Sequence, residues 1–479
     1  MESTTMKLSS EVKYLGVTID RKLSWNSHLN QVIGKAINTL WMSKRIFGNK
    51  WGLRPAMIHW VYKAIIRPRV TYASVVWWPK TNEKCAIDKL NKLQRLVLIS
   101  TTGAMRSAPS NALNAISNLL PLHQFVQLEA GKTALRLQRT KSSATGTTEG
   151  HLSIINRIRI NPLVTVIDDW METKFIFDRK FSVEEPNRSL WSSGGPQTRP
   201  GSVVFYTDGS KLNSLVGAGV TGPGINLSVS MGGWPTVFQA EIQAIIECST
   251  VCLERKYKHA NICIFSDSQA ALNALKSCTC TSKLVWECIQ LLQQLSNQNT
   301  LNLYWVPGHC GIEGNEKADE LARLGSSKQL IGPEPFCGIS PCSIKMEFRN
   351  WEKMMIDSNW KNTITSRQSK QFVMPHASNT HKILALSKKD LCTYIGLITG
   401  HCSAKYHLKI IGKADNDVCR FCNEEIESSA HLLCFCPSLY NKRAMFFEKG
   451  LLHPFEIWLS CPNKVVQFIR HIIPNWDHT

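Results

Sequence analysis

The stretch that decides the fold of this chain runs from Trp305 to Ala322 and reads WVPGHCGIEGNEKADELA. It follows an alternating apolar run, residues 301–306, which predicts a strand. Prolines and glycines then indicate a loop that carries His309. We expect Asn315 to cap the next helix and Asp319 to lie one turn into it. An imidazole and a carboxylate held this way suit metal-assisted chemistry on a phosphate.

Acidic residues also lie at the ends of buried elements upstream. Asp208 ends one apolar strand, Asp267 ends a second, and Glu241 lies on a helix expected over residues 236–255. Because the ends of neighbouring strands meet at one sheet edge, these acids are expected to converge with Asp319. Four carboxylates in one place repel each other unless cations hold them together. The pattern therefore predicts two Mg²⁺ ions, about 4 Å apart, that support in-line cleavage of a phosphodiester.

The order Asp208, Glu241, Asp267, Asp319, with His309 in a Gly-His-x-Gly-x-x-Gly-Asn-Glu-x-x-Asp loop, resembles ribonuclease H. The resemblance covers roughly residues 201–326. It implies an α/β domain with a five-stranded mixed sheet and flanking helices, and an endoribonuclease that cleaves the RNA strand of RNA–DNA hybrids. It also implies that the four acids bind two Mg²⁺ (or Mn²⁺) and that His309 helps proton transfer or product departure. Three neighbours are expected to contact nucleic acid: Gly209, Ser210 and Asn315.

Two other functions compete with this interpretation. The chain could be a non-catalytic nucleic-acid-binding remnant, although the presence of all four acids favours an active nuclease. It could also be a transposase or integrase of the same fold. Those enzymes use three acids and lack the Gly-His-x-Gly loop, so this alternative ranks last.

Composition limits the remaining possibilities. The 479 residues suffice for two to four domains. No run of about 18 apolar residues predicts a membrane span, and residues 1–7 do not read as a signal peptide. The 17 cysteines are therefore expected to be thiols or metal ligands rather than disulfides.

Positive charge is concentrated in the first part of the chain. Residues 1–140 hold 21 Lys and Arg against 6 Asp and Glu, whereas residues 201–325 hold 8 against 10. The region resembling ribonuclease H is thus slightly acidic. We expect affinity for a polyanion to come chiefly from the first 140 residues.

Three helices are expected in that basic region, over residues 27–47, 54–66 and 82–101, with Pro68 ending the second. The third carries its basic residues opposite its apolar face: Lys84, Lys89, Lys92 and Arg95. These side chains, with nearby tryptophans, suit binding to a nucleic-acid duplex. The competing interpretation is a solvated lysine face over a tryptophan core.

Residues 14–17, Tyr-Leu-Gly-Val, and the segment from Lys63 through Tyr72 resemble the part of a non-LTR retrotransposon reverse transcriptase that follows its palm. The resemblance, to LINE-type elements of the jockey or I kind, implies a thumb and connection in the C-terminal part of a polyprotein. Retrotransposon RNA or DNA and a reverse transcriptase palm would then be partners. The sole Asp-Asp pair, Asp168-Asp169, lies far downstream without a strand pair, so we predict no polymerase activity.

The C-terminal region contains a metal-ligand pattern. Cys419 and Cys422 are followed by His431 and Cys436, a set that fits one tetrahedral Zn²⁺. The pattern resembles the Cys-Cys-His-Cys tail module of the same polyproteins. Cys434 is a competing ligand, and unligated thiols in a small core are the alternative.

Together these patterns predict six regions. They are a thumb/connection-like basic helical region (1–137), a linker (138–200), the ribonuclease H-like domain (201–326), a helical tether (343–412), a small zinc-binding module (413–445) and a C-terminal helical tail (446–479).

Overall fold

The structure is a computed structural model that describes residues 9–43, 52–140, 150–158, 168–375, 377–474 and 476. The chain divides into two compact units. The first unit contains the described residues up to 138, those from 150 to 158 and those from 350 onward. The second unit contains the described residues from 168 to 349.

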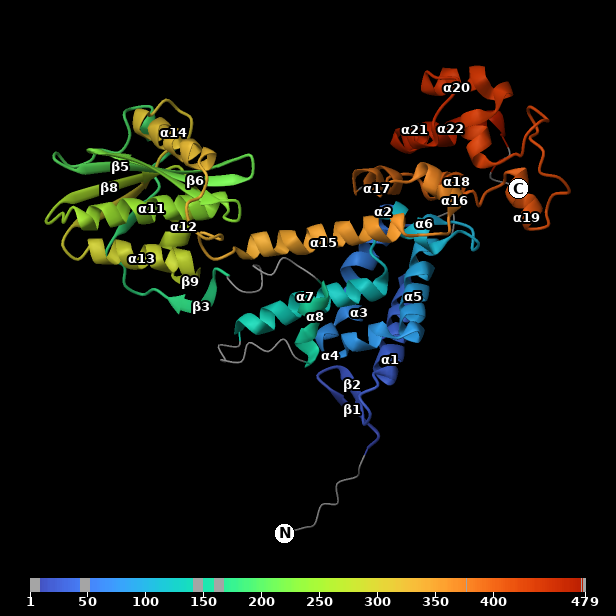
Figure 1. Cartoon of the computed structure of the whole chain (residues 1–479), viewed down its shortest axis with the longest axis horizontal. Helices are drawn as coiled ribbons and strands as arrows, with labels where there is room; N and C mark the ends of the chain where they lie inside the picture. Colours follow the sequence, from blue (N-terminus) through green and yellow to red (C-terminus); the bar gives the residue numbers. More distant parts are fainter. Residues whose placement is uncertain are drawn as a thin grey trace, which may run out of the picture. The chain divides into compact units, whose positions relative to one another are not determined.

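The second unit is built on a six-stranded mixed sheet with the strand order β4-β10-β8-β5-β6-β7 (Figure 1). Its strands are β4 (Ser182–Glu184), β5 (Val203–Leu212), β6 (Leu215–Gly222), β7 (Ile225–Gly232), β8 (Asn261–Ser266) and β10 (Thr300–Trp305). Strands β5, β6 and β7 are antiparallel neighbours, as expected for a hairpin that turns at residues 222–225. Strands β5, β8, β10 and β4 run parallel. The parallel strands direct their carboxyl ends to a single edge, where the acids lie.

Helices cover the sheet through close backbone contacts. The helices are α11 (Val237–Glu254), α12 (Gln269–Lys276), α13 (Lys283–Leu295) and α14 (Glu313–Ser327). Thr236 caps α11 in a capping box with Gln239. Helix α14 packs on β6 where Gly217 and Gly219 lie, since a Cβ on either glycine would come within 2.5 Å of the α14 backbone. These two glycines bring α14, and Asp319 with it, close to β5.

The prediction of a five-stranded sheet missed one strand of the six in the structure. All five predicted strands lie within residues 201–326, and β4 adds a sixth from the segment expected to be a linker. The same segment supplies β3 (Trp170–Phe175), which pairs with β9 (Thr279–Ser282). Asp169 accepts hydrogen bonds from the Ser282 hydroxyl and the Leu284 amide, which places its carboxylate at the start of α13. Residues 168–200 therefore belong to the second unit rather than forming a separate linker.

The first unit is almost entirely helical, with one small hairpin, β1 (Glu11–Tyr14) and β2 (Val17–Asp20). Its first part contains α1 (Asn26–Ser43), α2 (Pro55–Val61), η2 (Tyr62–Ile66), α3 (Arg67–Thr71), α4 (Ser74–Trp77), η3 (Trp78–Asn82), α5 (Lys84–Thr102), α6 (Ser110–Ile116), α7 (Leu122–Thr140), η4 (Gly150–Ser153) and α8 (Ile154–Ile158). Its later part contains α15 (Pro341–Lys361, which begins in the second unit), α16 (Arg367–Phe372), α17 (Ala377–Leu384), α18 (Lys388–Thr399), α19 (Lys405–Ile410), η5 (His431–Phe435), η6 (Pro437–Leu439), α20 (Tyr440–Phe447), α21 (Pro454–Leu459) and α22 (Pro462–Ile472).

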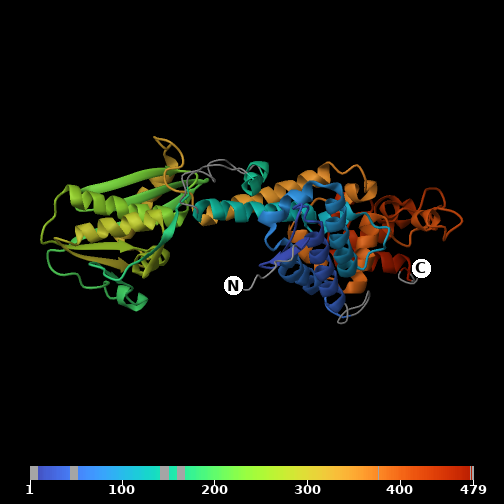
Figure 2. The same cartoon turned by 90° about the horizontal axis from the view of Figure 1, so that it is seen from below.

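The two parts of the first unit share one hydrophobic core. Tyr62, Trp77 and Leu90 from the first part are buried in the same cluster as Tyr394 and Phe468 from the second. Both views show the N-terminal helices beside the C-terminal ones (Figures 1 and 2). Residues from 350 onward are therefore packed against the basic region, where the sequence suggested a separate tether, module and tail.

The helix expected over residues 54–66 does not end at Pro68. It continues through a π-helical turn, η2, into α3, and Pro68 lies in the first turn of α3. A proline costs little there, because the first amides of a helix have no intrahelical acceptor. The end of the helix predicted over residues 27–47 lies partly outside the described residues. Within the described part of the chain, no helix has the length and apolar character needed to cross a bilayer.

Candidate functional site

Two neighbouring parallel strands bring the first two acids together. Thr207 of β5 lies opposite Ser266 of β8, so Asp208 and Asp267 each follow a residue at the same level of the sheet. Carboxylate oxygens of Asp208, Glu241 and Asp267 all lie within 4.8 Å of one another. The structure thus gathers three of the four predicted acids in one cluster that could hold a metal ion.

Glycines make room for this cluster. A Cβ on Gly209 would lie 2.6 Å from the Glu241 amide nitrogen, so only glycine lets α11 approach β5 so closely. Gly308 has a similar role in the loop after β10, because a Cβ there would lie 2.6 Å from Asp267 Oδ2. The role of Gly209 in this structure is to position Glu241 beside Asp208; Ser210, the next residue of β5, is half-buried.

Asp319 reaches the cluster from α14. Its carboxyl group is in hydrogen-bonding contact with Asp208, and its Oδ2 lies 3.9 Å from His309 Nδ1. His309 is largely exposed and has a φ of +54°, on a loop that Gly311 also turns in the left-handed region. One ligand atom each from His309, Glu316 and Asp319 also lie within 4.8 Å of one another. The predicted fourth acid and the predicted histidine are therefore both beside the three-acid cluster.

Two features of α14 differ from expectation or were missed. The helix begins after Ile312, which makes no side-chain cap, so the prediction that Asn315 caps it is wrong. Asn315 instead lies inside the first turn, buried, with its side chain hydrogen-bonded to Asp267. Arg323 was not singled out, yet its guanidinium lies 2.6 Å from Asp319 Oδ2. The four-residue spacing of Asp319 and Arg323 on a helix is the signal that could have identified this pair.

The cluster is electrostatically strained without cations. Burial, with the negative charges of Asp267 and Asp319, raises the pKa of Asp208 from 3.8 to about 7. Burial and the charge of Asp208 raise the pKa of Glu241 well above its usual range. Burial raises the pKa of Asp267 as well, although hydrogen bonding from Asn315 opposes the shift. Glu241 Oε2 is buried without a hydrogen-bond partner, as expected of an oxygen placed to ligate a cation.

Comparison with known families explains this arrangement. The family model described as RNase H matches residues 200–327, the segment that carries all four acids and His309. Residues 200–327 are a ribonuclease H domain. Rat ribonuclease H1 is 30% identical over 147 residues, a match that covers 26% of this chain and 51% of that protein.

The ribonuclease H domain is also related to retrotransposon proteins. A Pol polyprotein from the type-1 retrotransposable element R1 of Bradysia coprophila is 25% identical over 121 residues, covering 25% of this chain and 12% of that protein. An R1 polyprotein from Nasonia vitripennis is 27% identical over 133 residues, covering 28% of this chain and 33% of that protein. The matches thus cover an eighth to a third of these polyproteins.

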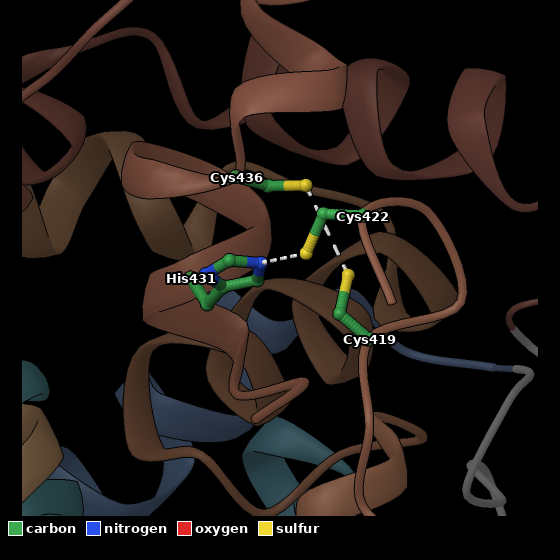
Figure 3. Close-up of side chains that lie close together, drawn as sticks. All are labelled: Cys419, Cys422, His431 and Cys436. Atoms are coloured by element: carbon green, nitrogen blue, oxygen red, sulfur yellow. Dashed lines mark hydrogen bonds between the residues drawn. The ribbon is translucent and has the colours of Figure 1, made fainter. Parts of the chain in front are cut away.

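A second cluster of possible metal ligands lies in the first unit. Ligand atoms of Cys419, Cys422, His431 and Cys436 all lie within 4.8 Å of one another (Figure 3). Cys419 Sγ lies 3.9 Å from Cys436 Sγ, and Cys422 Sγ lies 3.4 Å from His431 Nε2. Ligands about 2.0–2.3 Å from one tetrahedral zinc would lie about 3.3–3.8 Å apart, so the donor set fits Zn²⁺. None of the 17 cysteines, all of which the structure describes, is joined in a disulfide.

A π-helix positions the last two members of this cluster. His431 and Cys436 are five residues apart, and η5 joins them by a hydrogen bond from the Cys436 amide to the His431 carbonyl. The wider turn brings both side chains toward the two cysteines of the preceding loop (Figure 3). Cys434, the competing ligand, is buried but is not in the group. The geometry therefore favours Cys436.

Polar contacts surround the cluster and hold its loop. Glu425 Oε2 lies 2.9 Å from His431 Nδ1 without making a hydrogen bond to it, so the carboxylate lies beside the imidazole of the cluster. Arg420 makes a two-pronged ion pair with the buried Glu427. The fully buried Arg443 donates to the carbonyl oxygens of Cys436 and Gly450.

The predicted basic face of α5 is only partly available to a ligand. Lys84 and Lys92 are exposed. Lys89 Nζ, in contrast, donates to Asn30 Oδ1, and Arg95 donates to the Ser110 hydroxyl and the Arg106 carbonyl. Arg95 therefore stabilises the loop after α5, a role that its sequence position did not reveal.

Proposed function

We propose that the ribonuclease H domain is an endoribonuclease that cleaves the RNA strand of RNA–DNA hybrids by metal-dependent phosphodiester hydrolysis, as part of a retrotransposon polyprotein. The observation that carries the proposal is the convergence of Asp208, Glu241 and Asp267 within 4.8 Å, with Asp319 against Asp208. The match to ribonuclease H supports it independently.

The acids are proposed to hold two Mg²⁺ or Mn²⁺ ions. Bound divalent cations stabilise charge on the attacking and leaving oxygens and help to ionise the attacking water. The protein contributes the positions of the oxygens. Gly209 fixes Glu241 against β5, and Asn315 orients Asp267. Because its buried Oε2 has no partner, Glu241 is ready to accept a cation without breaking a hydrogen bond.

His309 and Arg323 are proposed to act beside the acids. His309 lies on an exposed loop within 3.9 Å of Asp319, where an imidazole can pass a proton to or from the phosphate. Arg323 neutralises part of the negative charge of Asp319. On binding of cations it would be free to turn toward a backbone phosphate of the substrate.

The Cys/His cluster is proposed to hold one structural Zn²⁺. The chemistry of the ligand set and its spacing support this assignment. The exposed Lys84 and Lys92 are proposed to contact retrotransposon RNA or DNA. A reverse transcriptase palm in a longer polyprotein is a proposed partner, from the R1 relatives.

A cleavage assay tests the main proposal. Purified protein is incubated with a labelled RNA–DNA hybrid, a DNA duplex and an RNA duplex, in Mg²⁺ or in EDTA. We expect cleavage of the RNA strand of the hybrid in Mg²⁺, no cleavage in EDTA, and no cleavage of the DNA duplex or the RNA duplex. Glu241→Gln should lower the rate by at least about a thousandfold, because several kcal/mol of charge stabilisation are lost. Glu254→Gln, which alters an exposed acid on the same helix, is the matched control and should cleave normally.

The outcomes separate the competing functions. Binding of the hybrid without cleavage in Mg²⁺ or Mn²⁺ would make the chain a non-catalytic binding protein. Cleavage or joining confined to duplex DNA would favour the transposase or integrase alternative. Equal rates of hybrid cleavage by Glu241→Gln and Glu254→Gln would contradict a mechanism that depends on the four acids.

A further inference from the structure

A cavity lined by both polar and apolar groups lies in the first unit, outside the ribonuclease H domain and the Cys/His ligands. Its volume is about 490 Å³, within the range of small-molecule sites. Its walls come from the loop after α5, the start of α16, the end of α18, α19 and the residues just before η5 (Figure 1). Gly400 ends α18 with a φ of +77°, and a Cβ there would collide with the Gln368 amide. The cavity wall is therefore closely packed at this point.

The lining is suited to a flat, polar and anionic ligand. Among the described residues that line the cavity, none is Asp or Glu, and Arg367 brings a positive charge to its rim. Tyr406 and His401 supply aromatic surface, and Gln371 supplies an exposed amide. Such a combination of ring faces, amides and a guanidinium is what nucleobases and their phosphates require.

Two neighbouring imidazoles lie at the floor of the cavity. The ring centroids of His401 and His407 are 4.7 Å apart, edge to face, and His401 Nδ1 lies 2.9 Å from the Ser107 hydroxyl. Burial, with the charges of His407 and Arg95, lowers the pKa of His401 to about 4, and burial also lowers the pKa of His407. Both rings are neutral at neutral pH, so each offers one donor and one acceptor.

Two buried polar atoms of the lining have no partner within the protein. His407 is only 4% exposed, and its Nε2 makes no hydrogen bond. The Ser366 hydroxyl oxygen is also buried and unpaired. Both residues line the cavity, and an unpaired buried polar group costs about 1–3 kcal/mol, which a ligand that reaches these atoms would recover.

The loop of the Cys/His cluster forms one wall of this cavity. Ser428, a lining residue, accepts a hydrogen bond from the His431 amide. Glu427 accepts hydrogen bonds from the amides of Lys405 and Tyr406 at the start of α19. The cavity and the cluster are thus parts of one rigid arrangement.

We propose that this cavity binds a single unstacked nucleotide from an unpaired RNA or DNA strand. The base stacks on Tyr406 and on the imidazole of His401, and its edge meets the polar atoms of Ser366, Gln371 and His407. The adjoining phosphate lies near Arg367. This site goes beyond hybrid cleavage: it would hold an unpaired strand, whereas the ribonuclease H domain takes a duplex.

Binding measurements on the full chain test the proposal. Fluorescence anisotropy is recorded with no added divalent cation and no chelator, so that cleavage is prevented while the Cys/His cluster keeps its metal, with labelled ten-nucleotide homopolymers of RNA and of DNA and with a hybrid duplex. Tyr406→Ala should weaken binding of single strands at least about fivefold, because base stacking on an aromatic ring contributes about 1–3 kcal/mol. Tyr406→Phe keeps the ring and should bind as the unchanged protein does. Tyr440→Ala, at a tyrosine 51% exposed on α20, is the matched control and should have no effect.

Each alternative has a distinct outcome. Equal weakening for single strands and for the hybrid would exclude a site specific for unpaired nucleotides. If nucleoside monophosphates compete at the same concentration as the strands, the ligand is a free nucleotide and the proposal fails. The ratio of the affinities for the RNA and DNA homopolymers shows which kind of strand the site prefers.

Photocrosslinking of the unchanged protein decides the question if Tyr406→Ala does not fold. A strand that carries 4-thiouridine or 4-thiothymidine is irradiated with the protein, which is then digested with trypsin. The expected crosslink lies on the peptide from Tyr406 to Lys409, or on a peptide with His401. Crosslinks confined to other parts of the chain would overturn the proposal.

Discussion

The acidic cluster of the ribonuclease H domain and the Cys/His cluster of the first unit gather their ligands in opposite ways. Asp208, Glu241, Asp267 and Asp319 come from four elements spread over 112 positions of the chain. The Cys/His ligands come from 18 consecutive positions in one loop and one turn. The first cluster is positioned by a complete domain core, and the second lies in a segment with little regular structure around it.

The difference teaches what a cation does in each place. The domain core holds the acids together even though they repel each other, and raised pKa values show the cost of that placement. A cation there would serve the proposed cleavage reaction. In the Cys/His loop, a cation would fix a segment with few helices or strands, and its binding energy would add to the stability of the core in which Cys419 and Cys436 are already buried. We therefore expect loss of metal to stop activity in the first case and to lower stability in the second.

The largest expected effect on stability is loss of zinc from the Cys/His cluster. Cys419→Ser and Cys436→Ser should abolish zinc binding and destabilise the first unit by several kcal/mol, since structural zinc contributes on the order of 10 kcal/mol in small modules. Cys434→Ser, at a buried thiol outside the ligand group, should keep about one equivalent. Zinc content after native purification and the melting temperature are the measurements. If Cys436→Ser retained zinc and Cys434→Ser lost it, Cys434 would be the fourth ligand and the assignment of Cys436 would be wrong.

Without bound divalent cations, the acidic cluster should make the ribonuclease H domain less stable as the pH rises. The folded pKa of Asp208 is about 7 against an ordinary value of 3.8, so between these values the folded state binds more protons than the unfolded state. Stability is then lost as pH rises from about 4 to 7, by up to about 4 kcal/mol for this group. Asp208→Asn should melt at an increasingly higher temperature than the unchanged protein over that range. A difference that does not vary with pH would contradict the account.

Nucleic-acid affinity should depend on the first unit rather than on the acidic domain. Lys84→Ala with Lys92→Ala should weaken hybrid binding about tenfold, measured with no added divalent cation and no chelator, and lower the slope of log affinity against log salt by about 2. Lys442→Ala, at an exposed lysine on α20, serves as the control. An unchanged salt slope in the double variant would remove α5 from the binding surface. These substitutions are preferable to a deletion, because residues 350 onward share a core with the basic region.

The smallest effect is expected at Arg323. Its guanidinium would compete with a cation for Asp319, and an ion pair whose arginine side chain is 59% exposed contributes about 1 kcal/mol at most. Arg323→Ala should lower the Mg²⁺ concentration for half-maximal cleavage by about two- to fivefold. Lys317→Ala removes a comparable ion pair with Glu320 on the same helix and should leave that concentration unchanged. A higher Mg²⁺ requirement in Arg323→Ala would mean that Arg323 supports cation binding.

Sequence periodicity and turn chemistry predicted most of the ribonuclease H domain. Helix α11, expected over residues 236–255, runs from Val237 to Glu254, and the strand expected over residues 301–306 is β10, Thr300–Trp305. These elements are regular and strongly patterned, so local signals suffice. The order of the acids then indicated the cluster, because strand ends in such a sheet meet at one edge.

The remaining features depend on contacts between distant residues. Strand β4 has three residues and no apolar alternation, so only its pairing with β10 makes it a strand. Asp169 was assigned to a linker, yet it caps α13 more than 100 positions later. The π-helical turn at His431 and the shared core of the first unit likewise leave no local pattern. Asparagine is a residue type that is common at helix N-caps, but α14 begins after Ile312, and the Asn315 side chain contacts Asp267 from within the first turn.

Calorimetric titration of Mn²⁺ into the full chain tests most directly whether the four acids are placed together to hold cations. At pH 6, below the pKa of about 7 of the metal-free Asp208, binding should release about one proton per protein, seen as a heat that differs between buffers of different ionisation enthalpy. Asp267→Asn should lose this proton-linked heat, and Glu254→Gln should retain it. Saturable binding that releases no proton, or an identical titration for Asp267→Asn, would contradict the account.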